Sequence, residues 1–425
     1  MLLVSQIIEN KDKVVQGLKK KRFKNVEETL DSVILLDKKR RETQVRLDEI
    51  LAETNSKSKE IGILMKNGKK EEADKIKDET SSLKQQGKSL GQDLERYEKE
   101  LNELLLTIPN IAHESVPEGV LPKDNLVVYE SGVIPQLADE AMPHWELIEK
   151  YDIIDFDLGN KITGAGFPVY KGKGARLQRA LINFFLDEAL KAGYIEIQPP
   201  IVVNEDSGYG TGQLPDKEGQ MYPISNTNLY LIPTAEVPIT NLYRNVILSD
   251  DDLPVKNVGY TPCFRSEAGS WGAHVRGLNR LHQFDKVEIV QVQKAENSYS
   301  VLEEMVAHVR GLLEKLELPF RILKLCGGDM GFTSSLTYDL EVYSAAQKKW
   351  LEVSSVSNFE AYQSNRLKLR YKKDQKNKPE LLHTLNGSAL ALPRIVAALL
   401  ENNQNSEGIK IPKVLTAYTG FDLIN

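Results

Sequence analysis

The sequence predicts an α+β protein, with a long antiparallel helical hairpin followed by a body built on an antiparallel β-sheet flanked by helices. Residues 1–110 hold 44 charged side chains and no proline before Pro109, a composition typical of helices. Apolar residues recur in this segment at heptad spacing. Beyond it, several strand-like runs follow one another without helix-length segments between them, which favours an antiparallel sheet.

The arm is predicted from two series of heptad positions, spaced alternately by four and three residues. In the series from Val26 to Met65, seven of the twelve positions are apolar, and in the series from Ala73 to Leu104, eight of the ten are apolar. The Asn-Gly pair at residues 67–68 is typical of a chain reversal. We therefore expect a two-helix coiled-coil hairpin over about residues 26–105, within an N-terminal domain of residues 1–110.

Polar residues interrupt the first series at Asp37, Arg40 and Gln44. We expect solvent to reach the seam, the line of contact between the two helices, at these positions. Basic side chains gather at residues 19–24 and again at residues 38–41. Such clusters neutralise the phosphates of a nucleic acid, but they are also typical of a solvated helix face.

The charge of the chain is unevenly distributed. The 425 residues carry a formal charge of −6, which argues against a simple nucleic-acid coat. Residues 1–110 nevertheless hold 23 basic and 21 acidic side chains, so the acidic excess belongs to the body. The two cysteines are too few for a disulfide framework, and no run of 18 apolar residues occurs. We expect a cytoplasmic protein without a membrane partner.

The body begins after a proline-rich stretch at residues 109–143, which we interpret as a linker with entry loops. A helix is predicted at residues 176–192, and the lysine-rich stretch 368–378 is predicted to be a loop. The strand-like runs are residues 195–203, 257–264, 286–292, 337–343 and 350–354.

A predicted hairpin at residues 260–290 carries the most informative side chains. Because alternate residues of a strand share a face, we expect Arg265, Glu267, Phe284 and Glu288 to point at one surface. Arginine offers a planar fork for phosphate, phenylalanine a stacking surface for a base, and a carboxylate an acceptor for an amine. This combination indicates a nucleotide site.

Two further segments carry polar groups. Glu341, Glu352 and Ser355 place acids and a hydroxyl on adjacent predicted strands, as a hard cation bridging phosphates requires. Residues 385–388 are predicted to form a polar turn that leads into an apolar helix bearing Arg394. Pro393 is unfavourable inside a helix, so that helix is expected to kink or to begin late.

Together these segments resemble class II aminoacyl-tRNA synthetases, and specifically the bacterial type of the seryl-tRNA synthetase family. The resemblance rests on FRSE at 264–267, FDKVE at 284–288, TAE at 234–236, EVSS at 352–355 and GSALALPR at 387–394. It implies a catalytic domain over residues 111–425, with the three class motifs near 193–203, 260–290 and 385–400.

The resemblance implies that serine is activated with ATP to seryl-adenylate and then transferred to the 3′ end of serine tRNA. Arg265 would bridge the serine carboxylate and the α-phosphate, and Arg394 would be the second catalytic residue. Glu267 would bind the adenine amine, with Phe284 and Arg394 enclosing the ring. Arg280 and Arg394 would hold the triphosphate.

The remaining roles follow from the same resemblance. Magnesium would enter with ATP and be bound by Glu352 and Ser355, whereas no zinc is expected. The ATP site would also include Ser266, Val353 and Ser354. The serine site would be formed, together with Arg265, by Thr234, Ala235, Glu236, Glu288, Asn386 and Ser388.

In this family the arm reaches across a homodimer to the long variable arm of the tRNA. The implied contacts with tRNA are Lys38, Lys39, Arg40 and Arg41 in the arm and Arg276 in the loop 268–280. Selenocysteine tRNA stays open as a second RNA substrate. Two other functions also stay open: an amino-acid:carrier-protein ligase on the same fold, and a catalytically inactive relative of the synthetases.

Overall fold

The computed structural model describes residues 1–216, 219–267, 276–374 and 376–425. It divides into two compact units. One unit comprises residues 2–19 and 23–109, and the other comprises residue 1, residues 20–22 and residues 110–425.

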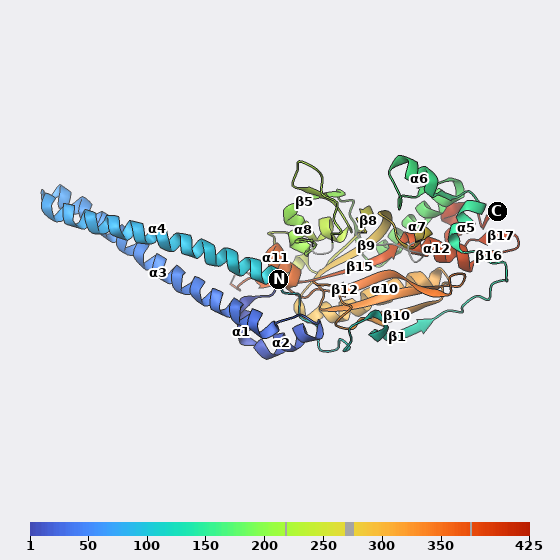
Figure 1. Ribbon diagram of the computed structural model, residues 1–425, viewed down its shortest axis with the longest axis horizontal. Coiled ribbons are helices and arrows are strands. Elements are labelled where there is room, and N and C mark those ends of the chain that lie inside the picture. Colours follow the sequence, from blue (N-terminus) through green and yellow to red (C-terminus); the bar gives the residue numbers. More distant parts are fainter. Residues whose placement is uncertain (217–218, 268–275, 375) are drawn as a thin grey trace. The chain divides into compact units, whose positions relative to one another are not determined.

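The first unit contains the predicted helical hairpin (Figure 1). After α1 (Val4–Glu9) and α2 (Lys11–Lys20) come the long helices α3 (Val26–Lys66) and α4 (Lys70–Thr107), which pack together. Gly68 has φ +74°, a conformation that glycine adopts without steric cost, so the Asn-Gly pair reverses the chain as predicted.

The register of the seam in α3 differs from the prediction in its second half. Ile50 is buried, whereas Leu51 and Met65 are 48% and 54% exposed. Either of two adjacent apolar residues fits a spacing of three or four residues, so the sequence pattern alone does not decide between Ile50 and Leu51.

The predicted opening of the seam at Asp37 is wrong. Asp37 is only 4% exposed. Its carboxylate accepts hydrogen bonds from Arg40, with the Nη2 to Oδ1 distance at 2.9 Å, and it also pairs with Arg41. A buried carboxylate is tolerated because both guanidinium groups neutralise it while their outer edges stay in water.

The second unit is built on a sheet of eight strands in the order β1-β10-β11-β12-β15-β9-β8-β4. Neighbouring strands are antiparallel except for β4 and β8, which are parallel, so the predicted antiparallel sheet is confirmed with one exception. The strands are β1 (Leu126–Ser131), β4 (Ile195–Glu196), β8 (Val255–Phe264), β9 (Gln283–Gln293), β10 (Phe320–Lys324), β11 (Leu336–Ser344), β12 (Lys349–Asn358) and β15 (His383–Ala391).

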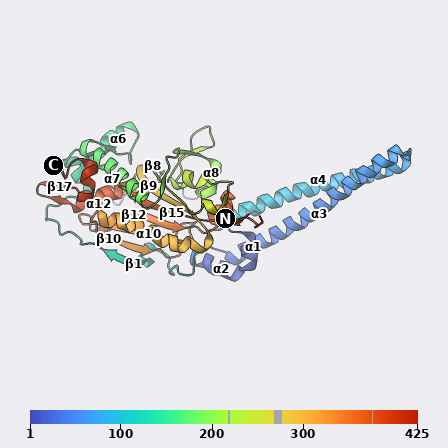
Figure 2. The same ribbon diagram turned by 180° about the vertical axis from the view of Figure 1, so that it is seen from behind.

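The three longest helices of this unit all contribute to the main hydrophobic core: α7 (Gly172–Lys191), α10 (Ser298–Lys315) and α12 (Leu392–Asn402). Figure 2 shows these helices gathered about the sheet from the opposite side to Figure 1. On β11, Tyr338 and Leu340 pack into this core, whereas Thr337 and Asp339 line a cavity. The alternation of side chains along each strand thus separates a core face from a functional face.

The smaller elements complete the second unit. Its other helices are α5 (His144–Lys150), α6 (Phe156–Ile162), α8 (Glu205–Thr211), α9 (Glu236–Asn241), α11 (Tyr362–Leu367) and α13 (Thr416–Thr419). Its small sheets consist of β2 (Ile154–Asp155) with β3 (Val169–Tyr170), β5 (Val202–Asn204) with β6 (Leu229–Leu231), β7 (Ile247–Ser249) with β13 (Arg370–Lys372) and β14 (Glu380–Leu381), and β16 (Gln404–Asn405) with β17 (Gly408–Lys410) and β18 (Leu423–Ile424).

Four predictions of local structure need correction. The run 195–203 is two short strands, β4 and β5, because Pro199 and Pro200 lack the N–H groups that a continuous ladder needs. Residues 385–388 lie inside β15 rather than in a turn. The predicted loop 368–378 contains β13, and the predicted linker 109–143 contains β1. The late helix start is confirmed, because α12 begins at Leu392 with Pro393 in its first turn.

Candidate active site

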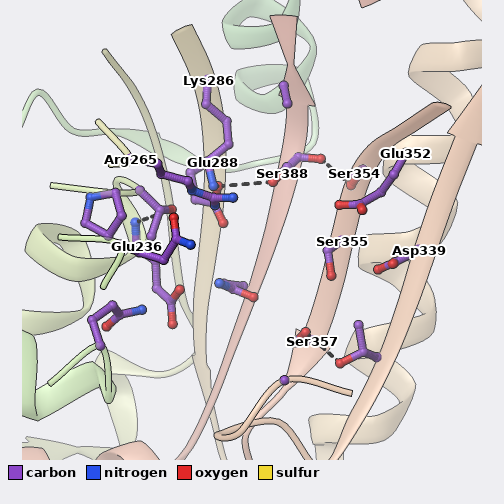
Figure 3. A pocket seen from close by; sticks show the side chains of 18 of the residues that line it. Glu236, Arg265, Lys286, Glu288, Asp339, Glu352, Ser354, Ser355, Ser357 and Ser388 are labelled. Atoms are coloured by element: carbon purple, nitrogen blue, oxygen red, sulfur yellow. Dashed lines mark hydrogen bonds and ion pairs between the residues drawn. The ribbon is translucent and has the colours of Figure 1, made fainter. Parts of the chain in front are cut away.

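A cavity of about 680 Å³ lies on the functional face of the sheet. Figure 3 shows carboxylates, hydroxyls and cations from neighbouring strands converging on it. The polar residues of β9, β11, β12 and β15 reach the cavity because strand alternation turns them away from the core. Segments far apart in the sequence therefore supply one site.

The predicted nucleotide residues of the hairpin meet in this cavity. Arg265, Glu267, Phe284 and Glu288 all line it. The guanidinium carbon of Arg265 lies 5.4 Å from the centre of the Phe284 ring, within the range of a cation–π interaction. Glu267 forms an ion pair with Arg280. The two groups expected to contact opposite ends of ATP therefore lie within reach of each other.

Two buried carboxylates occupy the other end of the cavity. Glu288 is 1% exposed, and its Oε2 lies 2.6 Å from Lys286 Nζ and 3.4 Å from the Ser388 hydroxyl. Glu236 is 6% exposed and accepts a hydrogen bond from the Gln363 amide at 2.7 Å. One lysine thus faces two carboxylates, so the charge of the pocket favours binding of a second cation.

Burial raises the pKa of Glu236 to about 7, and the negative charge of Glu288 acts in the same direction. The hydrogen bond from Gln363 and the charge of Lys286 oppose this shift in pKa. A bound ammonium group would favour the ionised carboxylate, so this pocket is electrostatically suited to a cationic ligand.

Arg394 stands in the first turn of α12, at the edge of the cavity. Its Nε donates to the carbonyl oxygen of Asn279 at 3.0 Å, and its Nη1 donates to the carbonyl oxygen of Glu352 at 2.7 Å. Two main-chain acceptors thus hold the guanidinium group in one orientation.

The comparisons with known proteins decide the family. Residues 1–112 match the model described as the seryl-tRNA synthetase N-terminal domain, and residues 222–403 match the tRNA synthetase class II core domain (G, H, P, S and T). A serine--tRNA ligase of Salinibacter ruber is 50% identical over 393 residues, 92% of each chain. The chain belongs to the seryl-tRNA synthetase family. Another relative with the same description, from Carboxydothermus hydrogenoformans, is 46% identical over 426 residues and covers 100% of this chain and 99% of its own.

Structures of the seryl-tRNA synthetase family share this fold. The seryl-tRNA synthetase of Pyrococcus horikoshii, solved in complex with ATP, superposes with a TM-score of 0.92 at 32% identity. The superposition covers 100% of this chain and 99% of that one.

Most residues that the resemblance to seryl-tRNA synthetases singled out reach the cavity. Thr234, Asn386 and Ser388 line it with the residues described above, as do Glu352, Val353, Ser354 and Ser355. Two are placed elsewhere. Ala235 is fully buried in a cluster with Ile239 and Val290, and Ser266 donates its hydroxyl hydrogen bond to the carbonyl oxygen of Gly219.

An acid that the sequence analysis missed lies beside the predicted magnesium residues. Asp339 is paired across the strands with Ser355 and lines the cavity, and its buried Oδ1 has no hydrogen-bond partner. Burial and the nearby Glu352 hold its pKa well above the usual range. Glu341, the acid named from the sequence, instead pairs with Arg321.

Asp339, Glu352 and Ser355 fit a magnesium ion that is held mainly by phosphates. Mg²⁺ commonly takes one or two protein carboxylates and completes its shell with water and phosphate oxygens. Within the described ranges, no set of three or more His, Cys, Asp or Glu side chains is arranged to hold a metal ion. The unpartnered Asp339 oxygen and the carboxylate of Glu352 suit a cation that arrives with its own ligands.

Lys286 and Gln363 are the other site residues that the sequence analysis missed. Lys286 lies two residues before Glu288 on β9, so strand alternation alone placed it on the same face. Gln363 has no such signal, because it comes from the short helix α11 and reaches Glu236 only through the tertiary fold.

The predicted tRNA residues lie outside the cavity. Arg276 is exposed, with its guanidinium carbon 5.0 Å from the centre of the Trp145 ring. Residues 268–275 of the predicted tRNA loop lie outside the described residues. In the arm, Lys38, Lys39 and Arg41 are exposed and Arg40 is half-buried. Arg40 and Arg41 pair with Asp37, and Lys38 pairs with Glu42.

The basic cluster at residues 19–24 is largely occupied by protein contacts. Lys21 donates to the carbonyl oxygens of Gly331 and Ser334 at 2.6 Å each, and burial lowers its pKa to about 7. Lys20 and Arg22 also donate to main-chain carbonyl oxygens. The prediction that this cluster binds phosphates is therefore not favoured. Among the helices that the structure describes, none is long and apolar enough to cross a membrane.

Proposed function

We propose that this chain is a serine--tRNA ligase. It activates L-serine with ATP, releasing pyrophosphate, and transfers the seryl group from seryl-adenylate to the 3′ end of serine tRNA. The observation that carries the proposal is the meeting of the FRSE, FDKVE, TAE, EVSS and GSALALPR side chains in one cavity. Relatives at 50% and 46% identity with the same described activity support it.

Neither chemical step needs an acid-base side chain. In the first, the serine carboxylate attacks the α-phosphorus and pyrophosphate leaves. In the second, a ribose hydroxyl attacks the carbonyl carbon and AMP leaves. Catalysis therefore depends on positioning and on stabilising negative charge. Arg265 bridges the serine carboxylate and the α-phosphate, where charge grows in the transition state.

The pocket around Glu236 and Glu288 selects serine. The two carboxylates bind the ammonium group, and Thr234, Asn386 and Ser388 contribute hydrogen bonds to the substrate. A pocket built to bind a hydroxyl group rejects an analogue without one by about 10⁴-fold, because its own buried polar groups lose their partners. Alanine is therefore refused by unpaired hydrogen bonds, whereas threonine is refused by lack of space.

ATP binds over the hairpin and the start of α12. Phe284 and Arg394 enclose the adenine, Glu267 accepts a hydrogen bond from its amine, and Arg280 joins Arg394 on the phosphates. Glu267 and Arg280 also form an ion pair with each other. This ion pair contributes little to stability, because Arg280 is partly exposed to solvent.

Magnesium bound with ATP would be held by Glu352 and Ser355, with Asp339 beside them. It would supply positive charge to the phosphates while they are held in a bent conformation. Glu352 also keeps Arg394 in place through its main-chain carbonyl oxygen. The same strand thus positions a cation site and a guanidinium group.

The tRNA is bound by the N-terminal domain of residues 1–110, and the catalytic domain of residues 111–425 receives the acceptor end near Arg276. Of the arm cations predicted to contact tRNA, Lys38, Lys39 and Arg41 are exposed and suit contacts to the RNA backbone, and recognition is by shape more than by bases. Selenocysteine tRNA, whose serylation uses the same chemistry, is included in this proposal. The protein acts in the cytoplasm.

A homodimer would be formed through motif 1. Ile195 in this motif is 66% exposed, and Leu190, just before the motif, is 43% exposed. An isologous interface of this kind uses the same surface patch of both subunits.

The proposal is tested by charging serine tRNA with labelled serine. Full-length serine tRNA should accept serine, and the same tRNA without its long variable arm should be charged far less efficiently. Transfer of serine to a carrier-protein thiol but not to tRNA would refute the proposal in favour of a carrier-protein ligase. No seryl-adenylate and no product at all would indicate a catalytically inactive relative.

A further inference from the structure

A buried histidine and a buried glutamate join several segments behind the cavity. His144, the first residue of α5, and Glu401 in α12 are both fully buried. The Nδ1 atom of His144 lies 2.6 Å from Glu401 Oε1, and its Nε2 lies 2.8 Å from the backbone nitrogen of Leu278. Because a backbone N–H only donates, Nε2 is the acceptor and Nδ1 carries the proton toward Glu401.

The carboxylate of Glu401 is satisfied entirely by the protein. Its Oε1 also accepts from the backbone N–H of His144 and from the amide of Gln347, each at 2.9 Å, and its Oε2 accepts from the hydroxyl of Ser344. A buried carboxylate that loses one such donor incurs a large desolvation cost, so the network has one favoured geometry. It therefore fixes the relative positions of α5, α12 and the turn between β11 and β12.

The same network supports the turn η4 (Gly277–Asn279), which lies within motif 2 just before β9. Gly277 has φ +65°, and a Cβ atom there would lie 2.3 Å from His144 Nε2, so the turn rests directly on the imidazole ring. The amide of Asn279 donates to Gln347 Oε1 at 3.0 Å. The imidazole and the glutamine thus hold η4 from two sides.

This turn reaches two of the proposed ATP residues. The carbonyl oxygen of Asn279 accepts the hydrogen bond from Arg394 Nε at 3.0 Å, and Arg280 follows Asn279 directly. Arg394 and Glu401 are seven residues apart on α12, so they lie on the same side of the helix, two turns from each other. The network therefore contacts both the helix that carries Arg394 and the turn that precedes Arg280.

We propose that His144 and Glu401 are positioning residues for ATP. They hold η4 against α12 so that Arg280 and Arg394 present their guanidinium groups to the phosphates. Neither residue lines the cavity, so both act through other side chains. This inference deepens the proposed function and rests on it, because ATP is the ligand whose binding is positioned.

The test is the exchange of pyrophosphate into ATP by the full-length protein, with ATP and serine varied separately. His144→Leu keeps an apolar side chain of similar size but removes both hydrogen bonds. We expect the KM for ATP to rise at least about tenfold, because small displacements of positioned groups are costly. The KM for serine should stay within about twofold, since Glu236 and Glu288 are held by other elements.

His383→Leu is the matched control. The His383 ring is hydrogen-bonded to the Ser298 hydroxyl at 2.8 Å but does not line the cavity, so this variant removes a comparable contact elsewhere. Its ratio of the two KM values should match that of the unchanged protein. Equal losses of thermal stability in the two variants, with unchanged KM ratios in both, would overturn the proposal and leave His144 a packing residue.

Two further variants keep the test decisive if His144→Leu does not fold. His144→Gln retains a donor and an acceptor and should restore most of the affinity for ATP. Gln347→Met removes the glutamine that joins Glu401 to Asn279 and should raise the KM for ATP alone. If Gln347→Met binds ATP and serine as the unchanged protein does, the proposal is wrong. Failure of the unchanged protein to exchange at all would instead refute the proposed function.

Discussion

The amide nitrogen of Gln363 lies 2.7 Å from Oε1 of Glu236, and both side chains are buried. The same amide donates to the carbonyl oxygen of Thr211 at 3.1 Å, and its oxygen accepts from the Thr384 hydroxyl at 2.7 Å. All polar atoms of Gln363 thus have partners, and the residue fixes the orientation of one carboxylate of the proposed serine pocket.

Replacing Gln363 by methionine should weaken serine binding. The change keeps the volume but removes the hydrogen bonds that Gln363 makes with Glu236 and Thr384, which costs about 1–3 kcal/mol for a buried polar group. We expect the KM for serine to rise about tenfold or more in pyrophosphate exchange, with a smaller effect on ATP.

Gln291→Met is the control for this change. Gln291 is also buried, but its side chain is hydrogen-bonded to Tyr194, at 2.7 Å, and to Gln293, neither of which lines the cavity. It should lower stability without altering the KM for serine. An equal effect of both variants on that KM would contradict the role assigned to Gln363.

The affinity for serine should depend on the ionisation of Glu236. Burial raises the pKa of this carboxyl to about 7, with Glu288 adding to the shift and Lys286 opposing it. Since serine keeps its ammonium group over this range, the KM for serine should fall about tenfold from pH 6 to pH 8. A KM that does not change over this interval would contradict the assignment.

The same raised pKa makes a prediction for stability. Because the folded state holds the proton of Glu236 more tightly than the unfolded state, the stability that this group contributes is complete below pH 4.5 and is lost as the pH rises through about 7. Glu236→Gln should therefore be more stable than the unchanged protein by roughly 3 kcal/mol at pH 8, and the difference should vanish near pH 4. Urea unfolding at both pH values measures it.

Replacing Glu352 by glutamine should weaken the binding of Mg²⁺, so that more Mg²⁺ is required for the same rate of exchange. We expect the Mg²⁺ concentration for half-maximal exchange to rise about tenfold, since a neutral amide is a weaker ligand for a hard cation. Glu341→Gln provides the comparison, because Glu341 pairs with Arg321 and does not line the cavity. A similar shift for both variants would argue against a magnesium contact by Glu352.

Deleting residues 30–100 should separate the two steps of the reaction. The deletion removes most of the hairpin, whereas every residue proposed to bind ATP or serine belongs to the other unit. Serine-dependent exchange should persist, and charging of tRNA should be abolished. Equal loss of both activities would refute the division of labour between arm and catalytic domain.

The hairpin and most central strands could be predicted because each carries a local periodic pattern. Residues 337–343 show this well, since alternating apolar and polar side chains are enough to place Thr337 and Asp339 on one face. The register of α3 near Ile50 could not be predicted, because Leu51 follows the same pattern and only the packing partner distinguishes them.

The errors in the body arose where tertiary contacts override local preference. Asn386-Gly387 is a turn signal in isolation, yet Gly387 is needed inside β15, where a Cβ atom would come within 3.2 Å of Val356. Gln363 and the pair of His144 with Glu401 likewise have no local signature. Gln363 and Glu236, like His144 and Glu401, are more than 100 residues apart in sequence, so only the fold brings them together.

The central claim is tested most directly by amino-acid-dependent exchange of pyrophosphate into ATP over a panel of amino acids. We predict exchange with serine well above that with alanine or threonine, and loss of at least about 10³-fold in Arg265→Ala, in which the charge on the α-phosphate is no longer stabilised. Exchange that needs no amino acid, or that is fastest with one other than serine, would contradict the account.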